Sequence, residues 1–361
     1  YMRPLNATID PQALIHNFKR VKDFAPNSKV MSVLKANAYG HGLIESARAL
    51  NKSEGFSVLT LGEAIELREF GFNQEILMLE GVYEGYEVAI ASKLNINVVL
   101  HNQEQLNQIL DAKPKKPINV HLKVNTGMNR LGWMPEDLPQ VFKVITSTPF
   151  IGKVTLMTHF SSADEKEGIA SQMKVFNNIQ NDHQFDRSVA NSAALIRYPE
   201  SHLEWVRPGI MLYGASPFED SSINELDLKA VMSLDSQIIS IQSLKKGESV
   251  GYGSSFVAES PMKIGVVACG YADGYPRHAP TGTPAMVDNV MTSTVGRVSM
   301  DMLYVDISKI NDVKVGGRVE LWGKNVPVDA VAKKAGTVGY ELLCSISSAQ
   351  RVPLRYLDGQ N

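Results

Sequence analysis

The chain has 361 residues, 44% hydrophobic and 20% charged, which is enough to bury a core in one large domain and a smaller one. Its net charge of −2 comes from interspersed acidic and basic residues, which argues against a nucleic-acid partner or an anionic membrane surface. The two cysteines have neither CxxC nor Cys/His ligand spacing, so we expect neither a metal site nor a disulfide framework. No apolar run has the length of a membrane span and no leader pattern opens the chain, so we expect a cytoplasmic protein with a small-molecule ligand.

Strand-like and helix-like segments alternate over the first part of the chain. Asp10 and Pro11 fit an N-cap and a first helical residue, and they predict an amphipathic helix. Eight strand-like runs follow, at residues 31–36, 55–60, 74–81, 96–102, 118–127, 150–160, 187–195 and 204–214. This alternation is typical of a parallel barrel or a doubly wound sheet, and eight units favour the closed barrel. We therefore predict an α/β fold in which residues 1–230 form a TIM-type (β/α)8 barrel.

The pattern changes in the last third of the chain. Residues 233–253, 263–276 and 292–308 are rich in strand formers and in glycine-containing turns, and only residues 326–336 have a helical pattern. We predict a mainly β C-terminal domain over residues 231–361. Because no low-complexity tract separates the two parts, we expect a packed interface between them.

Polar residues recur where the predicted barrel strands end. They are Lys35, Arg130, His159, Asn191, Ser192 and Arg207. In a TIM barrel this rim is the place where catalysis occurs, although strand ends are also polar simply because the chain reaches the surface there. Lys35 follows an apolar run, and a lysine that loses hydration tends towards its neutral, nucleophilic form. Lys35 is therefore a candidate covalent catalyst.

A series of motifs, in this order, resembles the signature series of bacterial alanine racemases. The motifs are VLKANAYGHG, KVNTGMNRLG, THFSSAD, NSAA, RPGIMLYG, VGYGSSF, CGYADGYPR, VGRVSMDM and GYELLCSIS. The resemblance extends over essentially the whole chain. It implies an isomerase that depends on pyridoxal 5′-phosphate (PLP), interconverts L-alanine and D-alanine, and works as a homodimer with active sites shared between the subunits.

The resemblance implies two catalytic bases. Lys35 matches the lysine that binds the cofactor aldehyde covalently, and it can act as a base once the substrate has displaced it. Racemisation removes a proton from one face of the substrate Cα and delivers one to the other face, which is awkward for a single base. Tyr252 matches the second base, which reaches the site from the other subunit in that family. Tyr271 matches a tyrosine at the substrate entrance that helps to hold the catalytic one.

The resemblance also implies a set of cofactor contacts. Arg207 matches the residue that faces the pyridine nitrogen of the cofactor. Because an arginine keeps its proton, it donates a hydrogen bond and leaves this nitrogen unprotonated. The cofactor ring is then a weaker electron sink, which favours prompt reprotonation of the substrate Cα. His159 resembles the histidine that packs on the ring and hydrogen-bonds the arginine. The positions that match the phosphate contacts are Tyr39, Ser192, Gly209, Ile210 and Tyr340. Asn191 belongs to the same cofactor site, and Asn191 and Ser192 also fit a helix cap.

Further positions match substrate contacts. Arg130 matches the arginine that contacts the cofactor phenolate and the substrate carboxylate, and Met300 matches the position whose backbone amide binds that carboxylate. Lys123 occupies the position at which some family members carry a carbamylated lysine; a carbamate would replace repulsion of Arg130 by attraction. The chain has Ser299 where the family often has cysteine and Asn129 where it often has glycine, and neither departure removes a catalytic atom.

Several alternatives stay open at this point. A broader amino-acid racemase would need only small changes near Met300 and Tyr340, whereas a decarboxylase of similar fold would place an acid where Arg207 stands. A non-enzymatic PLP-binding protein would not need Tyr252, and a barrel acting on sugar phosphates would leave Tyr252 and Arg207 without roles. D-alanine is a building block of peptidoglycan, so we expect a biosynthetic role; a catabolic role would use the same site.

Overall fold

The alternating first part of the chain forms a closed barrel of eight parallel strands in the order β2-β3-β4-β5-β6-β7-β8-β9. This computed structural model describes residues 3–180 and 182–358. The barrel strands are β2 (Lys29–Val33), β3 (Gly55–Val58), β4 (Glu75–Met78), β5 (Ile96–Leu100), β6 (Ile118–Lys123), β7 (Ile151–Met157), β8 (Asp186–Ala190) and β9 (Trp205–Val206). Strands covered on both faces are mostly apolar, and β5 (INVVL), with Asn97 as its one polar residue, is buried at every position. The predicted α/β fold with a TIM-type barrel is confirmed.

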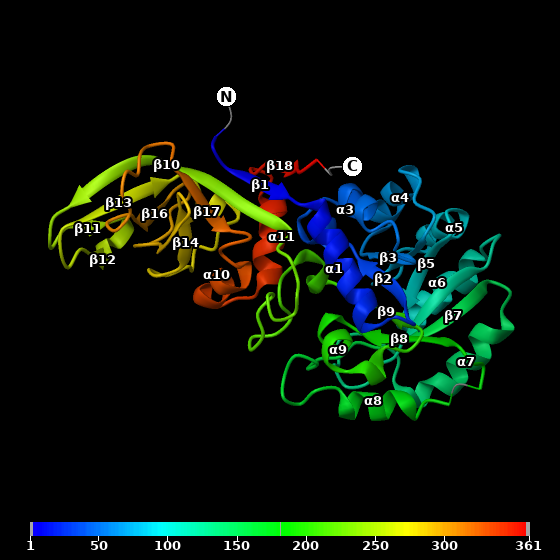
Figure 1. Cartoon of the computed structure of the whole chain (residues 1–361). Coiled ribbons are helices and arrows are strands. Elements are labelled where there is room, and N and C mark those ends of the chain that lie inside the picture. The colour runs from blue at the N-terminus through cyan, green and yellow to red at the C-terminus, as the bar shows by residue number, and fades with distance from the viewer. Residues whose placement is uncertain (1–2, 181, 359–361) are drawn as a thin grey trace.

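Helices surround the barrel (Figure 1). They are α1 (Pro11–Phe24), α2 (Lys35–Tyr39), α3 (Leu43–Ala49), α4 (Leu61–Glu69), α5 (Gly85–Lys93), α6 (Gln103–Ala112), α7 (Leu138–Ser147), α8 (Ala170–Asn177) and α9 (Ser192–Arg197), with the short turns η1 (Pro135–Asp137), η2 (Pro199–Ser201) and η3 (Ile210–Tyr213). The side chain of Asp10 accepts a hydrogen bond from Gln12 N, and Pro11 occupies the first helical position. The amphipathic helix predicted at Asp10 and Pro11 is therefore α1.

The second part of the chain is mainly β. Its elements are β10 (Met232–Leu244), β11 (Ser249–Val250), η4 (Tyr252–Ser254), β12 (Phe256–Val257), β13 (Met262–Val267), η5 (Tyr271–Asp273), β14 (Pro284–Val287), β15 (Val290–Ser293), β16 (Leu303–Asp306), β17 (Arg318–Trp322), α10 (Val328–Ala335), α11 (Gly339–Ala349) and β18 (Leu354–Tyr356). The main sheet has the order β15-β14-β17-β10-β1-β18, and β13 and β16 extend it. The long strand β10 organises this sheet because β1, β13 and β17 all pair with it.

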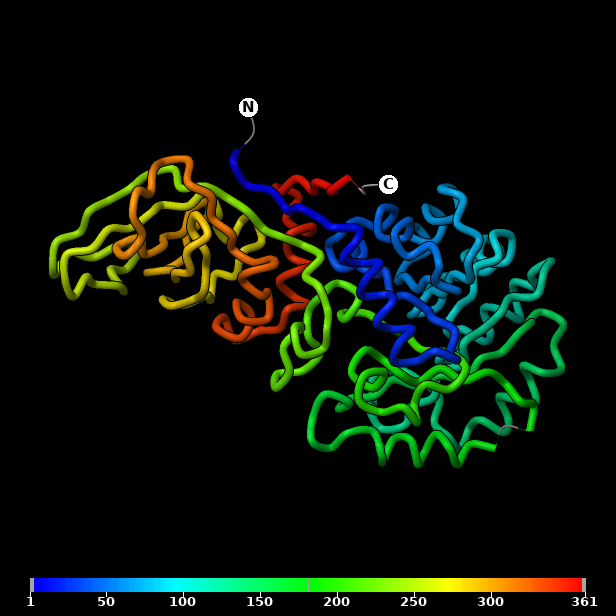
Figure 2. The backbone as a smooth tube through the Cα atoms, viewed as in Figure 1, coloured from blue at the N-terminus to red at the C-terminus, as the bar shows by residue number. Residues whose placement is uncertain are grey.

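Two features differ from the expectations. β1 (Asn6–Ile9), which falls within the residues that we assigned to the barrel, instead joins the second sheet: it pairs antiparallel with β10 and parallel with β18 (Figure 2). These partners are more than 220 residues away, so no local pattern could indicate them. The second difference is α11, a helix in addition to α10 in the part we expected to be mainly β. It begins with Gly339 and Tyr340 and contains several serines, which are weak helix formers.

The two parts are packed against each other. One continuous cluster of buried apolar side chains extends from the barrel into the second sheet, and α11 stands at the junction between them (Figure 1). α11 contacts both α2 of the barrel and η5 of the second part. Among the residues that the structure describes, no helix has both the length and the apolar character needed to cross a membrane.

Candidate active site

A cavity of about 790 Å³ opens at the carboxyl ends of the barrel strands. Among its walls are Lys35, Tyr39, Lys123, Arg130, His159, Asn191, Ser192, Arg207, Gly209, Ile210 and Tyr340. Because parallel strands all end on the same side of a barrel, residues that lie far apart in the chain meet at this rim. The structure thus brings together every barrel residue that the sequence singled out, and Tyr340 of α11 joins them.

Lys35 follows β2 and is the first residue of α2. Its side chain is partly buried in the cavity wall. Burial, and then the charge of Arg130, lower the pKa of Lys35 below that of an ordinary lysine. A larger fraction of its amine is therefore neutral and able to act as a nucleophile or a base.

The turn after Lys35 has an unusual backbone. Ala36, Asn37, Ala38 and Tyr39 all have φ between 51° and 55°, in the left-handed region. Each such residue costs roughly 1 to 2 kcal/mol, so the surrounding structure must hold the turn in place. Asn37 does this with both ends of its side chain: Oδ1 accepts from Leu43 N (2.8 Å) and Nδ2 donates to Ser347 Oγ (2.9 Å). The turn places Lys35 and Tyr39 on the same wall of the cavity.

Arg207 is the most firmly held cation of the site. It is buried, and it donates to Ser188 O (2.6 Å), Ser188 Oγ (2.8 Å) and Thr158 O (2.7 Å). Burial lowers the pKa of Arg207 to about 10, so it keeps its charge at neutral pH. Its Nη2 also lies 3.5 Å from His159 Nδ1, and burial together with the Arg207 charge holds the pKa of His159 well below its usual range. The imidazole of His159 is consequently neutral beside a permanent donor.

Small and hydroxyl-bearing residues form one end of the cavity. Ser192 Oγ accepts from the amides of Gly209 (2.9 Å) and Met211 (3.3 Å), so the start of α9 is tied to the loop after β9. A Cβ on Gly209 would lie 2.5 Å from the Tyr39 hydroxyl oxygen, and this close approach requires glycine. Asn191 caps α9 by accepting from Ala194 N (3.0 Å), as the cap interpretation expected.

Aromatic packing fixes this end of the cavity. The ring of Tyr39 stacks on Tyr213 at 4.7 Å between centroids, and Tyr213 donates its hydroxyl proton to Val33 O (2.6 Å). The ring of Tyr340 lies 6.1 Å from that of Tyr39. Burial raises the pKa values of Tyr39 and Tyr340, so both keep their protons and can act as hydrogen-bond donors. Hydroxyls and helix-start amides in one place suit a phosphate group.

Lys123 adds a further positive charge. It ends β6 and is buried, and burial followed by the charges of Arg207 and Arg130 lowers the pKa of Lys123 to about 8. The loops that carry Arg130 and His159 are joined by Gln172, which donates to Thr126 Oγ1 (2.9 Å) and His159 O (3.0 Å). Cations outnumber acids among the charged residues of this wall, which favours a ligand with several negative charges.

The sequence reasoning missed several residues of the cavity. Glu80 and His101 lie within two residues of the ends of β4 and β5, so the rule that found Lys35 could have found them too. The Glu80 carboxylate accepts from the Tyr83 hydroxyl, and His101 Nε2 lies 3.1 Å from Glu80 O. Cys344 of α11 also lines the cavity, but only the fold places it near Lys35.

Three of the singled-out residues do not reach this cavity. Tyr252, Tyr271 and Met300 are 75%, 38% and 54% exposed, and none lines the cavity, although all three lie in the described part of the chain. They belong to the second part: Tyr252 begins η4 between β11 and β12, at the end far from the barrel (Figure 1). Tyr271 and Met300 lie near each other, since Tyr271 N donates to Ser299 O (3.0 Å) and Ala272 N to Met300 O (3.0 Å).

The chain is similar to known proteins over nearly its whole length. Residues 9–217 match the family described as "Alanine racemase, N-terminal domain", and residues 231–356 match "Alanine racemase, C-terminal domain". The chain is 50% identical to a protein named "Alanine racemase" from Burkholderia mallei, over 98% of this chain and 99% of that protein. It is 49% identical to one of the same name from Nitrosospira multiformis, over 96% of this chain and 98% of that protein.

Solved structures agree with these matches. The crystal structure titled biosynthetic alanine racemase from Pseudomonas aeruginosa has a TM-score of 0.95 and 45% identity, covering 99% of this chain and 100% of that chain. The structure of alanine racemase from Acinetobacter baumannii has a TM-score of 0.91 and 41% identity over 99% of this chain and 100% of that chain. By its matches along both parts and its identity to full-length relatives, the chain belongs to the alanine racemase family.

Proposed function

We propose that this chain interconverts L-alanine and D-alanine, with PLP as its cofactor and two bases on opposite faces of the substrate. The observation that carries the proposal is the cavity that Lys35, a lysine of lowered pKa, shares with the fixed guanidinium of Arg207 and with a group of hydroxyls and amides. Membership of the alanine racemase family supports alanine as the substrate.

The residues of the cavity fit PLP. The hydroxyls of Tyr39, Ser192 and Tyr340 and the amide of Ile210 would hold the phosphate at one end, beside Gly209. Gly209, which has no Cβ, lets the Tyr39 hydroxyl approach this loop closely and so keeps that hydroxyl at the phosphate end. When bound, PLP withdraws electrons from the substrate Cα and makes its proton easier to remove.

Arg207 would face the pyridine nitrogen and His159 would pack on the ring, with Asn191 beside them. Because Arg207 keeps its proton, it can only donate a hydrogen bond, and the nitrogen opposite it stays an acceptor. This moderates electron withdrawal and favours prompt return of a proton to Cα. The hydrogen bonds to Ser188 and Thr158 keep the guanidinium aimed in one direction. An arginine here argues against a decarboxylase of similar fold.

Lys35 acts as one base. Its lowered pKa supports an amine that releases its proton at Nζ more readily than an ordinary lysine does. Arg130 would bind the substrate carboxylate with its rigid fork and keep Cα beside this amine.

Tyr252 acts as the second base, in the cavity of a second subunit. Its 75% exposure and its distance from its own cavity support a site that needs another chain to be complete. Tyr271 at the entrance and the Met300 amide on the substrate carboxylate would come from the same second subunit. We therefore propose a homodimer with two shared active sites.

Lys123 is proposed to carry a carbamate. A lysine with a pKa of about 8 has roughly a tenth of its amine neutral at pH 7, and a neutral amine adds to CO2 with loss of one proton. The resulting carboxylate would replace repulsion between two cations by attraction to Arg130. This would hold Arg130 in place against the substrate.

The cellular role proposed is supply of D-alanine for peptidoglycan, with alanine catabolism as the alternative use of the same site. Cytoplasmic location is supported by the free thiols of Cys269 and Cys344, which suit a reducing compartment. The proposed division is a barrel domain, residues 1–230, and a mainly β domain, residues 231–361. β1 belongs to the first range by sequence but pairs with strands of the second domain.

The activity is tested with PLP-loaded protein and L-alanine in deuterated water. We expect D-alanine that carries deuterium at Cα, because the new proton comes from a base equilibrated with solvent. Lys35→Ala and Tyr252→Phe should each lower racemisation by at least about 100-fold. Tyr86→Phe, at an exposed tyrosine of α5, is the matched control and should change little. Deuterium exchange of bulkier amino acids at equal rates would favour a broader racemase, and no exchange with any amino acid would favour a PLP carrier.

The shared site is tested by mixing Lys35→Ala and Tyr252→Phe subunits and allowing them to exchange. Each heterodimer then contains one cavity with an intact Lys35 and an intact Tyr252, so we expect about a quarter of the wild-type activity to return. Mixing either variant with itself should return none. Proven heterodimers without activity would contradict the shared site.

The carbamate is tested with 13C-labelled CO2 and carbon NMR. We expect one carbamate signal that is missing in Lys123→Met and present in Lys115→Met, the exposed control in the preceding loop. Because only the neutral amine reacts, the labelling rate should rise ~10-fold from pH 6 to pH 7 and level off above about pH 8. A signal that survives in Lys123→Met would place the modification elsewhere.

A further inference from the structure

Two loops of the second part of the chain, residues 270–274 and 299–301, form one unit, which we call the paired loops. Their backbones are joined by the hydrogen bonds from Tyr271 N to Ser299 O and from Ala272 N to Met300 O. A Cβ on Gly270 would lie only 2.3 Å from the carbonyl oxygens of both Ser299 and Met300, so the contact leaves no space for a side chain. The paired loops carry Tyr271 and Met300 on the surface.

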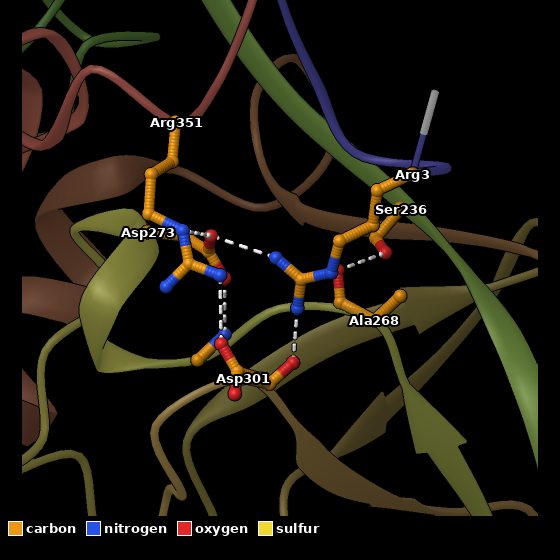
Figure 3. Close-up of polar contacts among 7 residues, drawn as sticks. Arg3, Ser236, Ala268, Asp273, Asp301 and Arg351 are labelled. Atoms are coloured by element: carbon orange, nitrogen blue, oxygen red, sulfur yellow. Dashed lines mark hydrogen bonds and ion pairs between the residues drawn. The ribbon is translucent and has the colours of Figure 1, made fainter. Parts of the chain in front are cut away.

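Two arginines from opposite ends of the chain bridge the paired loops (Figure 3). Arg3 donates from Nη1 to Asp273 Oδ1 (2.7 Å) and from Nη2 to the backbone oxygen of Asp301. Arg351 donates from Nη2 to Asp301 Oδ1 (2.7 Å), and its Nε lies 3.4 Å from Asp273 Oδ1. Each guanidinium therefore touches both loops, with separate nitrogens of one planar fork.

Asp273 is the centre of this arrangement. Its side chain is 0% exposed, while the side chains of Arg3 and Arg351 are 33% and 41% exposed. The second carboxylate oxygen, Oδ2, accepts from Gly270 N (2.9 Å), so the buried charge is neutralised by both arginines and tied to its own loop. A buried carboxylate that loses a cationic partner is strongly unfavourable, and the loop would move to expose it.

The paired loops are also tied to the rest of the molecule. Ser236 of β10 donates to Ala268 O (3.0 Å), just before the first loop, as Figure 3 shows. Ser345 of α11 donates to Gly274 O (2.7 Å) at the end of that loop. The same helix begins with Tyr340 in the cofactor cavity and leads to Arg351. The loops are thus held in a fixed relation to the barrel of their own chain.

We propose that Arg3 and Arg351 are positioning residues for the reaction: by gripping Asp273 and Asp301 they fix the paired loops, so that Tyr271 and Met300 enter the partner's cavity in one geometry. The proposal rests on the proposed function, in which the active site is shared. Surface loops without such ties sample many conformations, and a displacement of about 1 Å in a substrate contact can cost 100-fold in rate. Neither arginine touches the substrate, and each acts through the loops.

Steady-state kinetics of PLP-loaded Arg3→Gln and Arg351→Gln give the first test. We expect kcat/KM for alanine to fall by about 10-fold to 100-fold, with a raised KM, because the proposed Met300 contact with the carboxylate is misplaced. Affinity for PLP should be unchanged, since the cofactor contacts come from the barrel and α11. Arg318→Gln, which removes the exposed ion pair with Asp235 in the same sheet, is the control and should leave both values unchanged.

Heterodimers separate positioning from general damage. One chain carries Lys35→Ala and donates the loops to the single working site; the other carries Tyr252→Phe and supplies its cavity. The double substitution Arg3→Gln and Arg351→Gln on the loop-donating chain should lower kcat/KM by the same 10-fold to 100-fold that is expected above. The same double substitution on the chain that supplies the cavity should leave kcat/KM unchanged. If the double variant does not fold, Arg3→Gln alone is placed in the same two ways.

The outcomes are distinct. Equal losses in both placements would mean that the arginines act only on stability, and no loss in either would mean that the loops hold their geometry without them; both results overturn the proposal. If the heterodimer without arginine substitutions is inactive, the shared site itself is wrong and the proposal falls with it. Loss confined to the loop-donating chain supports it.

Discussion

The crowding of positive charge into one cavity is the constraint on which this site depends. The four cations are Lys35, Lys123, Arg130 and Arg207. Their mutual repulsion, added to burial, lowers the pKa of both lysines and makes them reactive amines. The same charges attract ligands with several negative groups. A phosphate, a substrate carboxylate and a carbamate would each relieve part of the repulsion, so ligand binding and the chemistry of Lys35 are parts of one electrostatic arrangement.

Such crowding is stable only because the barrel holds each cation separately. Arg207 cannot move away from the cavity, since two backbone oxygens and Ser188 hold its guanidinium. Lys35 is held by a left-handed turn that would be unfavourable in a free chain. The Asn37 side chain keeps that turn in place by accepting a hydrogen bond from α3 and donating one to α11. The strain and the charge repulsion are both offset by packing elsewhere, which is how a stable fold can maintain a reactive site.

The second part of the chain has a different task from the barrel. It presents Tyr252, Tyr271 and Met300 on its surface, away from the cavity of its own chain. In the proposed dimer each chain binds cofactor with one face and completes another site with a second face. α11 connects these faces, because it begins at the cofactor cavity and ends next to Arg351. A substitution on the cofactor-binding face would then affect the active site of its own chain. A substitution on the second face would affect the active site of the partner.

Local sequence determined most of the barrel and of the cavity wall. Buried parallel strands are continuous apolar runs, and the polar residues directly after them must lie at the rim, which is why Lys35, His159 and Arg207 could be assigned to one site. The same rule applies to Glu80 and His101, which were overlooked. The specific roles of these side chains came from motifs that resemble a known family, because spacing alone does not identify a cofactor.

Tertiary structure decided what no local pattern encodes. β1 pairs with strands that lie at the other end of the chain, and Arg3 meets Asp273 across 270 positions of sequence. α11 forms although it contains a glycine and several serines, because its apolar face, including Leu342 and Ile346, is buried against the rest of the fold. The exposure of Tyr252 far from Lys35 is likewise visible only in three dimensions. Contacts between distant segments depend on how whole elements pack, whereas strands, turns and strand-end residues depend on neighbours within a few positions.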